Sequence, residues 1–294
     1  MSVPVQTRIT PPAAARIEFG WIKQAWALFS AQPGVWIGTV TLSFSINVVL
    51  WALISLPTDP DVWASLKSVY AALVTHTQAP PARFMNPYLE FAQQTACNTL
   101  VAGISAIFTG GLYRMALRQK RGEPISVSGL FSAFPQSVPL FVVGIAVPTA
   151  LGLAESACLW LLHSHLSTTA SITAVNQADW LIGIFLNGLL MFAPLLVVDS
   201  GASVMEALVG SVRLLGRQWL RGIWFYIVAS FVGGIGLLLC GVGMLATYPI
   251  FLLSIAIGYL ALTLANTESE PPAFDPTPVG VWPPPPRVPE EKRL

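Results

Sequence analysis

The sequence predicts an all-α, polytopic membrane protein with six transmembrane helices. Two observations carry this prediction. First, 54% of the 294 residues are hydrophobic and only 10% are charged, whereas a soluble domain has roughly 25% charged residues. Second, the chain contains five runs with almost no charge. Each is long enough to cross the hydrocarbon core of a bilayer, which takes about 20 helical residues.

The fifth apolar run, residues 222–267, contains no charged side chain. At about 1.5 Å per residue, a single helix of this length would be more than twice as long as the hydrocarbon core is thick. The run must therefore fold back, and we expect the turn between Gly241 and Pro249, because glycine loosens a helix and proline interrupts it. The six predicted spans are residues 35–56, 97–117, 138–162, 180–198, 222–241 and 248–267.

The sequence predicts three parts of the chain: a short N-terminal segment, a membrane domain and a C-terminal tail. Residues 1–15 are predicted to be disordered, and residues 16–266 form the six-span membrane domain. The first 20 residues lack the apolar core of a secretory signal, so the first span is expected to serve as the targeting element. Residues 267–294 contain nine prolines and are predicted to be a disordered, solvated tail. A peptide ligand for a protein partner is the alternative interpretation of this tail.

The distribution of basic residues predicts the orientation of the spans. Of the 15 Lys and Arg residues, all except Lys67 and Arg83 fall before the first span, within or after the last turn of the second span, or after the fourth and sixth spans. Because cytoplasmic loops are enriched in Lys and Arg, we expect both termini in the cytoplasm. The same chain has a formal net charge of +1, which excludes a basic surface of the kind that binds nucleic acid.

Amphipathic stretches are predicted to precede the first, third and fifth spans as three interfacial helices on the cytoplasmic side. The third opens with a capping box, in which Ser203 is followed three residues later by Glu206. The two clearest apolar stripes recur at helical spacing. They are Phe19, Ile22, Trp26 and Phe29 before the first span, and Met205, Leu208, Val212, Leu215 and Trp219 before the fifth.

Two of these stretches share sequence letters, which suggests a threefold repeat of interfacial helix plus two-span hairpin. The segment Leu28-Phe29-Ser30-Ala31-Gln32-Pro33 parallels Leu130-Phe131-Ser132-Ala133-Phe134-Pro135, and Leu214–Trp219 fits loosely. A pseudo-threefold bundle around a central site is one interpretation. The favoured interpretation is that the three helices are interfacial anchors that orient the hairpins.

Polar residues inside the spans are the first candidate site. Glu155 in the third span is a carboxylate in a position where charge is costly. Asn47 and Asn187 place amides in the first and fourth spans. Together they are interpreted either as the lining of a polar path, with Glu155 handling protons or cations, or as structural groups that bond between helices. Convergence on one cavity would favour the first interpretation.

Arginines near the fifth span form the second candidate site. Arg213, Arg217 and Arg221 lie on the predicted cytoplasmic side. There, each basic residue near an anionic membrane surface contributes about 1 kcal/mol of attraction. These three residues are therefore candidate contacts for anionic lipid headgroups.

Metal, redox and hydrolytic sites are not expected. Cys97, Cys158 and Cys240 all lie in apolar runs, which excludes a disulfide framework. His163 and His165 have no third ligand nearby in the sequence, so they are a weak signal for a metal. No Gly-x-Ser-x-Gly, His-Glu-x-x-His, Walker or dinucleotide motif is present. We therefore expect no enzyme activity, no metal and no cofactor.

Short motifs across residues 16–265 resemble segments of uncharacterised bacterial six-helix membrane protein families. The similar segments are Trp21-Ile22-x-x-Ala25-Trp26-x-Leu28-Phe29-x-x-x-Pro33, Gly111-Leu112-Tyr113 through Arg121-Gly122-Glu123 to Leu130-Phe131, and Pro194-Leu195-Leu196-Val197-Val198-Asp199 with Glu206-Ala207-Leu208 and Ser211. These families include YciC-like proteins and the membrane domain of some glycerophosphodiester phosphodiesterases. The resemblance implies a six-helix fold and an inner-membrane location, and it transfers no catalytic residue.

Two functions remain open from the sequence. The favoured one is a non-enzymatic inner-membrane protein that binds or organises lipids or protein partners through its cytoplasmic interfacial helices. The alternative is a small transporter or permeation pathway that uses Glu155, Asn47 and Asn187.

Overall fold

The computed structural model describes residues 16–55, 87–162, 168–239 and 241–269, and all regular structure in this part of the chain is helical. The α-helices are α1 (Gly20–Ala31), α2 (Pro33–Ser55), α4 (Pro87–Lys120), α5 (Ser137–Leu162), α6 (Thr168–Leu190), α7 (Ala193–Ser200), α8 (Val204–Leu215), α9 (Trp219–Gly234) and α10 (Met244–Ser269). Short 3-10 helices are η2 (Val127–Phe131), η3 (Phe134–Gln136), η4 (Gly216–Gln218) and η5 (Ile235–Leu239).

Six stretches of the described residues are long and apolar enough to cross a membrane, which agrees with the predicted number of spans. They are Pro33–Ile54, Gln93–Lys120, Val127–Ala154, Leu181–Ser200, Val204–Leu238 and Met244–Ala265. The all-helical structure of the described residues and the predicted number of six such segments are therefore confirmed, and they indicate a multi-pass membrane protein.

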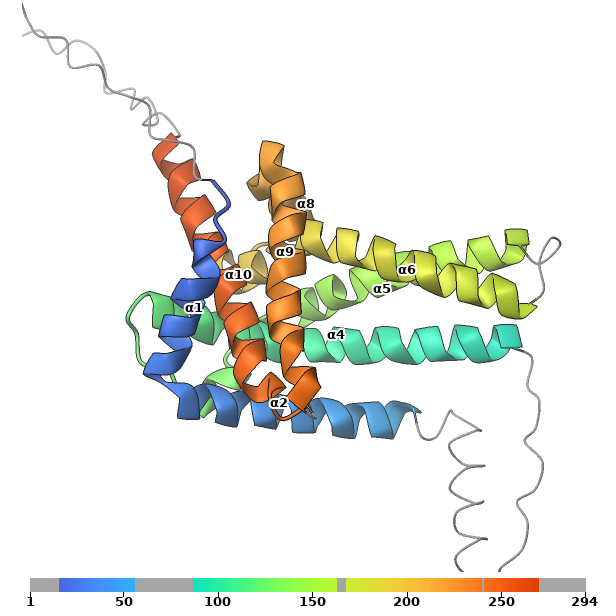
Figure 1. Ribbon diagram of the computed structural model, residues 1–294, viewed down its shortest axis with the longest axis horizontal. Coiled ribbons are helices and arrows are strands. Elements are labelled where there is room, and N and C mark those ends of the chain that lie inside the picture. The colour runs from blue at the N-terminus through green and yellow to red at the C-terminus, as the bar shows by residue number, and fades with distance from the viewer. Residues whose placement is uncertain (1–15, 56–86, 163–167, 240, 270–294) are drawn as a thin grey trace, which may run out of the picture.

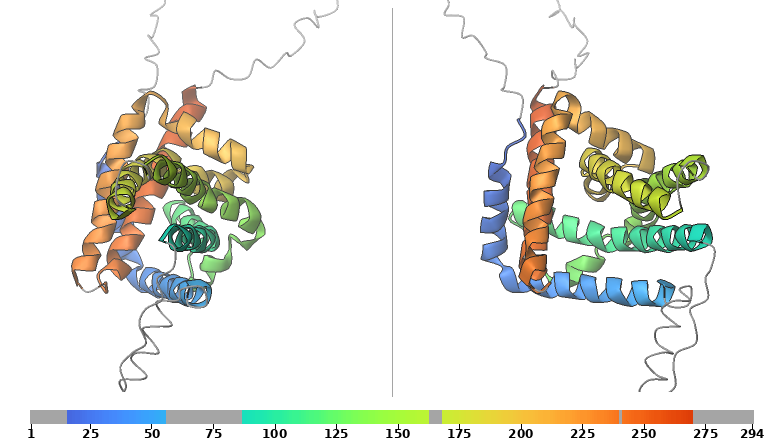
Figure 2. Two further views of the ribbon diagram at one scale, coloured as in Figure 1. Left: turned by 90° about the vertical axis from the view of Figure 1, so that its right-hand side faces the viewer. Right: turned by 45° about the vertical axis from the view of Figure 1, so that its right-hand side comes forward.

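The long helices form two sets that cross each other steeply. Helices α2, α4, α5 and α6 run roughly side by side, whereas α9 and α10 pass across α2 and α4, and both views in Figure 2 agree with Figure 1 on this point. The fold therefore differs from an up-and-down bundle, in which every span follows one axis. Since transmembrane helices usually tilt by about 20° and rarely beyond about 40°, one bilayer can contain both sets only if each tilts markedly.

The interior is built around α10 and the C-terminal half of α4. Leu252, Leu253, Ile255 and Ala256 of α10 are completely buried. At the periphery, large apolar side chains such as Phe231 (71% exposed) and Leu238 (81% exposed) point outwards. A chain that is apolar both inside and outside is suited to an apolar solvent, as expected for a protein in a bilayer.

Small residues bring α4 and α5 into close contact. A Cβ atom on Gly144 would lie 2.4 Å from the Cβ atom of Ala106 and 3.0 Å from the carbonyl oxygen of Ala102. A Cβ atom on Gly103 would lie 2.6 Å from side-chain atoms of Phe141 and Ile145. Glycine and alanine therefore set the distance between these two helices, which is the usual basis of helix association in membranes.

The predicted fourth span, 180–198, corresponds to the apolar stretch Leu181–Ser200, but the helix is interrupted within it. Helix α6 starts earlier, at Thr168, and ends at Leu190, and α7 begins at Ala193. Pro194 explains the break, because proline has no N–H with which to continue the hydrogen bonding of α6 and is well accommodated in the first turn of a new helix. Ser211 of α8 is fully buried beside the break. Its hydroxyl accepts from the Phe192 N–H at 3.2 Å and donates to the Leu189 carbonyl at 2.8 Å.

We expect Ser211→Ala to destabilise the protein by about 1–3 kcal/mol, because it leaves two buried backbone groups without a partner. Unfolding in mixed micelles measures the change. Ser200→Ala is the matched control, since its hydroxyl is exposed and bonds only to the Leu196 carbonyl of its own helix. Equal stabilities of the two variants would contradict this role for Ser211.

The predicted reversal of the fifth apolar run is confirmed, but Pro249 does not take part in it. Gly241 has φ of 80°, a left-handed conformation that favours glycine. The backbones on the two sides of the turn approach so closely that a Cβ atom on Gly236 would lie 2.3 Å from Gly243. Helix α10 starts at Met244, so Pro249 lies inside it. The helix then continues to Ser269, slightly beyond the predicted start of the tail at 267.

The apolar stripe predicted for the first interfacial helix is divided between the interior and the surface of the protein. Helix α1 buries Trp21, Ala25 and Phe29, whereas Phe19 and Trp26 are exposed. The Trp21 ring lies edge-on to the Phe225 ring, with ring centroids 5.3 Å apart. It also packs directly over Gly258 of α10, where a Cβ atom would lie 2.6 Å from the ring. Tertiary contacts, rather than the stripe alone, therefore orient this helix.

Helix α8 also packs through its small side chains. It buries Ala207, Ser211 and Leu215, of which Leu215 belongs to the predicted stripe, while the stripe members Met205, Val212 and Trp219 are exposed. The capping box of Ser203 and Glu206 is present. At the position of the second predicted interfacial helix, the structure has the 3-10 helices η2 and η3 instead. The three stretches therefore do not share one local structure.

Candidate functional site

The polar residues predicted to line a path do not form a common site where the structure describes them. Asn47 accepts a hydrogen bond from the Ser105 hydroxyl of α4 and donates to the Ser43 carbonyl of its own helix at 2.9 Å. Asn187 is exposed and donates to the Gly183 carbonyl of α6 at 2.8 Å. Helix α4 lies between α2 and α6 in Figures 1 and 2. Glu155 lies in α5, but its side chain is outside the described part of the structure.

A polar network at the C-terminal end of α4 joins several helices, and its residues were not among the candidate sites predicted from the sequence. Arg114 donates to the Val198 carbonyl of α7 at 3.0 Å, to the Gln136 side chain at 2.8 Å and to the Ser132 carbonyl. Val198 and Ser132 lie at the C-terminal ends of α7 and η2, where carbonyls lack helical partners and positive charge is favourable. Arg114 therefore ties two helix ends to α4.

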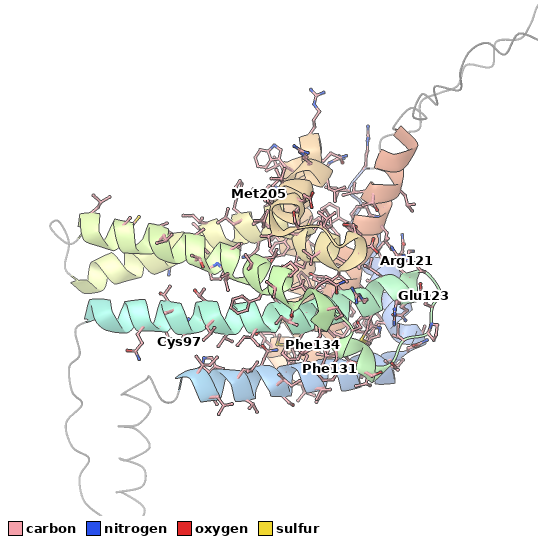
Figure 3. All side chains as sticks on the ribbon, turned by 180° about the vertical axis from the view of Figure 1, so that it is seen from behind. Cys97, Arg121, Glu123, Phe131, Phe134 and Met205 are labelled. Atoms are coloured by element: carbon pink, nitrogen blue, oxygen red, sulfur yellow. The ribbon has the colours of Figure 1, made fainter. Side chains whose placement is uncertain are left out.

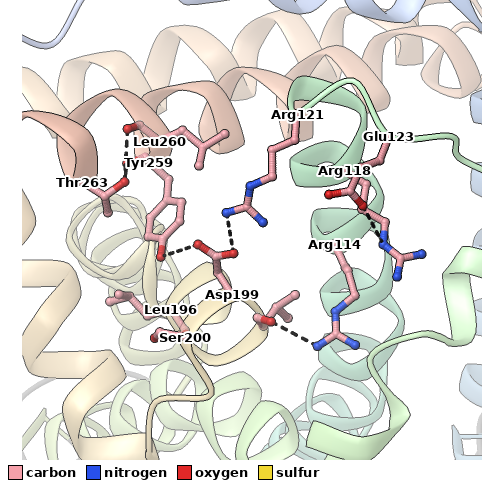
Figure 4. A network of polar contacts seen from close by, with 11 residues as sticks. Arg114, Arg118, Arg121, Glu123, Leu196, Asp199, Ser200, Tyr259, Leu260 and Thr263 are labelled. Atoms are coloured by element: carbon pink, nitrogen blue, oxygen red, sulfur yellow. Dashed lines mark hydrogen bonds and ion pairs between the residues drawn. The ribbon is translucent and has the colours of Figure 1, made fainter.

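An ion pair extends this network to α10 (Figure 4). Arg121 contacts the Asp199 carboxylate at 2.7 Å, and the Tyr259 hydroxyl donates to the other oxygen of Asp199 at 3.2 Å. A second pair, between Arg118 and Glu123 at 3.6 Å, is half exposed. Figure 3 shows Arg121 and Glu123 at one end of α4 and Cys97 towards the other. The network fastens α4, α7 and α10 together at this end.

Gln119 makes the corresponding connection to the N-terminal helices. Its side-chain oxygen accepts from the indole N–H of Trp36 at 2.8 Å, and its amide donates to the Leu28 carbonyl at 2.7 Å. Trp36 is fully buried. Because Leu28 lies in the last turn of α1, Gln119 satisfies a carbonyl that the helix leaves free. We interpret these contacts as structural, since every group is used within the protein.

The arginines near the fifth span have a different environment. Arg217 in η4 and Arg221 in α9 line one open pocket of about 480 Å³, together with Gln218, Leu220 and Arg16. Arg213 is exposed in the last turn of α8 and does not line the pocket. The structure thus brings two of the three predicted headgroup contacts together and adds a third arginine from the start of the described chain.

Arg16 reaches this pocket because the segment before α1 is fixed to the turn between α8 and α9. The backbone N–H of Ile17 donates to the Gln218 side chain at 3.1 Å, and Ile17 is buried in the hydrophobic core. In Figure 1 the chain enters α1 beside the upper ends of α9 and α10. Sequence reasoning missed Arg16 because it lies about 200 positions from Arg217, and only the fold brings the two together.

The pocket is positively charged and adjoins an apolar surface. Within the described part of the chain, Arg16, Arg217 and Arg221 have no carboxylate within 4.0 Å, in contrast to Arg118 and Arg121. Leu220 and Trp224, one helical turn apart on α9, are 55% and 57% exposed. An arrangement of cations above exposed apolar side chains suits an anion that carries a hydrocarbon chain.

Other candidate sites receive no support. No group of three or more His, Cys, Asp or Glu side chains that could hold a metal occurs among the described residues, and His163 and His165 lie outside them. Fold and site together define the chain as a helical multi-pass membrane protein with an arginine-lined pocket at one end. No protein-family model, curated protein or solved structure matches the chain.

Proposed function

We propose that the chain is a non-enzymatic inner-membrane protein that binds anionic lipids at the surface formed by α8, η4 and the start of α9. The observation that carries this proposal is the group of Arg213, Arg217 and Arg221, next to exposed apolar side chains of the same elements. Each arginine contributes about 1 kcal/mol near an anionic surface, and the exposed side chains of α8 supply the apolar contact of an interfacial helix.

The proposed orientation places this surface and both chain ends in the cytoplasm. It is supported by the positions of the described basic residues, which lie near α1, at the C-terminal end of α4 and around η4, and by their absence from α2, α5, α6 and α10. The proline-rich tail, which lies outside the described residues, is proposed to extend into the same compartment and to be available to a protein partner.

Labelling of single cysteines in intact cells tests the orientation. We expect a cysteine at Ala82 to react with a membrane-impermeant maleimide from outside, and a cysteine at Ser128 in η2 to react only after the cells are opened. Ser128 is exposed in the structure, so burial within the protein does not prevent its reaction. Labelling of Ser128 from outside would contradict the proposed orientation.

Lipid binding is tested with purified protein in a nonionic detergent, by titration with short-chain phosphatidylglycerol and with neutral phosphatidylcholine. We expect Arg213→Gln, Arg217→Gln and Arg221→Gln together to weaken phosphatidylglycerol binding at least tenfold, since three attractions of about 1 kcal/mol are lost. The charge-matched control combines Lys23→Gln, Arg118→Gln and Lys120→Gln, which are exposed elsewhere. An equal loss in both variants would refute a specific surface.

A transport pathway through Glu155, Asn47 and Asn187 is the alternative function. The separate hydrogen bonds of Asn47 and Asn187 do not favour it. Flux in proteoliposomes that is abolished by Glu155→Gln, with unchanged thermal stability, would favour transport over the proposed lipid-binding role.

A further inference from the structure

We propose that the pocket lined by Arg16, Arg217 and Arg221 holds the headgroup of one phospholipid, and that it selects a dianionic phosphomonoester over a monoanionic phosphodiester. This inference rests on the proposed function, because it names the lipid class that the anion-binding surface prefers. It also adds Arg16, which the sequence does not group with the other two arginines.

The pocket has the form of a built site rather than of scattered surface charge. Its lining comes from two segments that are distant in the sequence, and the hydrogen bond from the Ile17 N–H to the Gln218 side chain joins them at 3.1 Å. Ile17 is only 5% exposed, so the backbone that carries Arg16 is held by the core. With a volume of about 480 Å³, the pocket is in the usual range of ligand sites.

Charge determines the preferred ligand. Three guanidinium groups line the pocket, and none of them has a carboxylate partner among the described side chains. A phosphodiester brings one negative charge. A phosphomonoester carries about −1.5 to −2 charges at pH 7 and offers three acceptor oxygens. One guanidinium group can donate two parallel hydrogen bonds to two of these oxygens. The phosphomonoester therefore matches the three arginines better.

The apolar part of the surroundings indicates that the phosphate belongs to a lipid. Leu220 lines the pocket itself, and Trp224 continues the same exposed strip one turn further along α9. Trp219, at the start of α9, is also exposed and lies against Phe185 with ring centroids 6.0 Å apart. A soluble phosphate would leave these side chains uncovered, whereas acyl chains would lie along them.

The test compares short-chain phosphatidic acid, short-chain phosphatidylglycerol and inorganic phosphate, each titrated into the full-length protein in nonionic detergent. At pH 7.5 we expect phosphatidic acid to bind about fivefold to tenfold more tightly than phosphatidylglycerol, as one additional paired charge predicts. The preference should disappear at pH 5, because the second ionisation of the phosphomonoester has a pKa of about 6. Inorganic phosphate should compete only weakly.

Two single variants locate the preference. Arg16→Gln should reduce the ratio of the two lipid affinities towards one, whereas Arg118→Gln removes the same charge away from the proposed lipid-binding surface and should leave that ratio unchanged. Both arginines are exposed, so the thermal midpoints of the variants should match that of the parent protein. Loss of the ratio in Arg118→Gln, or its retention in Arg16→Gln, would overturn the assignment to this pocket.

The results separate the two proposals. Equal affinity of the parent protein for the two anionic lipids would refute the phosphomonoester preference, yet tighter binding of both than of phosphatidylcholine would leave the proposed function standing. Equal affinity for all three lipids would refute the proposed function itself. Competition by inorganic phosphate as strong as that of phosphatidic acid would show that the ligand is a soluble phosphate and not a lipid.

Discussion

Gly111→Ala is expected to destabilise the protein by about 3 kcal/mol or more, at the upper end of what overpacking costs. A Cβ atom at residue 111 would lie 1.9 Å from the carbonyl oxygen of Leu130 and 2.6 Å from its carbonyl carbon. These atoms belong to the backbone of η2, and Leu130 is completely buried. No rotation of a side chain can relieve the overlap, so α4 and η2 must separate.

Gly234→Ala is the matched control for this prediction. Gly234 also lies in an apolar helix, α9, but a Cβ atom there would meet no atom within 4 Å. Alanine favours helix by up to about 1 kcal/mol over glycine, so this variant should be neutral or more stable. Thermal unfolding in detergent and the yield in membranes measure both changes. A Gly111→Ala protein as stable as the parent would show that α4 and η2 are not in contact.

Arg114→Gln is expected to cost about 3 kcal/mol, because it leaves acceptors at the ends of two helices without a charged donor. The guanidinium group contacts Val198, Gln136 and Ser132 at once, and the shorter glutamine cannot reach all three. Besides lowering the free energy of unfolding, the loss should loosen α7 selectively. Hydrogen exchange at the amides of α7 measures this local effect.

Arg118→Gln provides the comparison for Arg114. It removes the same charge one turn further along α4, where both partners of the ion pair with Glu123 are about half exposed. Exposed pairs contribute about 0–1 kcal/mol, so the stability should hardly change. Equal losses in the two variants would mean that net charge, and not the bridging of helix ends, explains the role of Arg114.

The number of membrane-crossing helices could be predicted from the sequence because hydropathy is a local property. A run such as residues 222–267 is too long for one crossing wherever it lies in the fold, so a turn within it follows from its length. The glycines place that turn near Gly241. The capping box of Ser203 and Glu206 was predictable for the same reason, since its partners are three residues apart. Local signals of this kind also grouped Arg217 with Arg221.

Local signals did not reveal how an apolar segment is divided. The apolar composition of residues 180–198 predicted a span, and Leu181–Ser200 is long and apolar enough to be one. Pro194 interrupts the helical hydrogen bonding within it, so the segment consists of the end of α6 followed by α7. The break is tolerated because Ser211 of a third helix satisfies the freed backbone groups. The stripe containing Phe19 and Trp26 likewise did not indicate which of its side chains pack against the protein: Phe29 is buried, whereas Phe19 and Trp26 are exposed. In a membrane, an apolar side chain is equally compatible with the protein interior and with lipid, so hydrophobicity alone does not tell which face is buried.

By itself, therefore, the sequence determined that this is an all-helical protein with six apolar segments, a reversal near Gly241 and basic residues gathered at the ends of alternate spans. Only the tertiary structure decided that α9 and α10 cross the other long helices steeply, and that Arg114 and Gln119 fasten helix ends together. It also decided that Arg16 shares a pocket with Arg217 and Arg221. The physical reason is that hydropathy, capping and turn signals act between near neighbours in the chain, whereas these contacts join distant residues. The hydrogen bond between Ile17 and Gln218 joins residues 201 positions apart, and it exists only because the helices between them pack in one particular way.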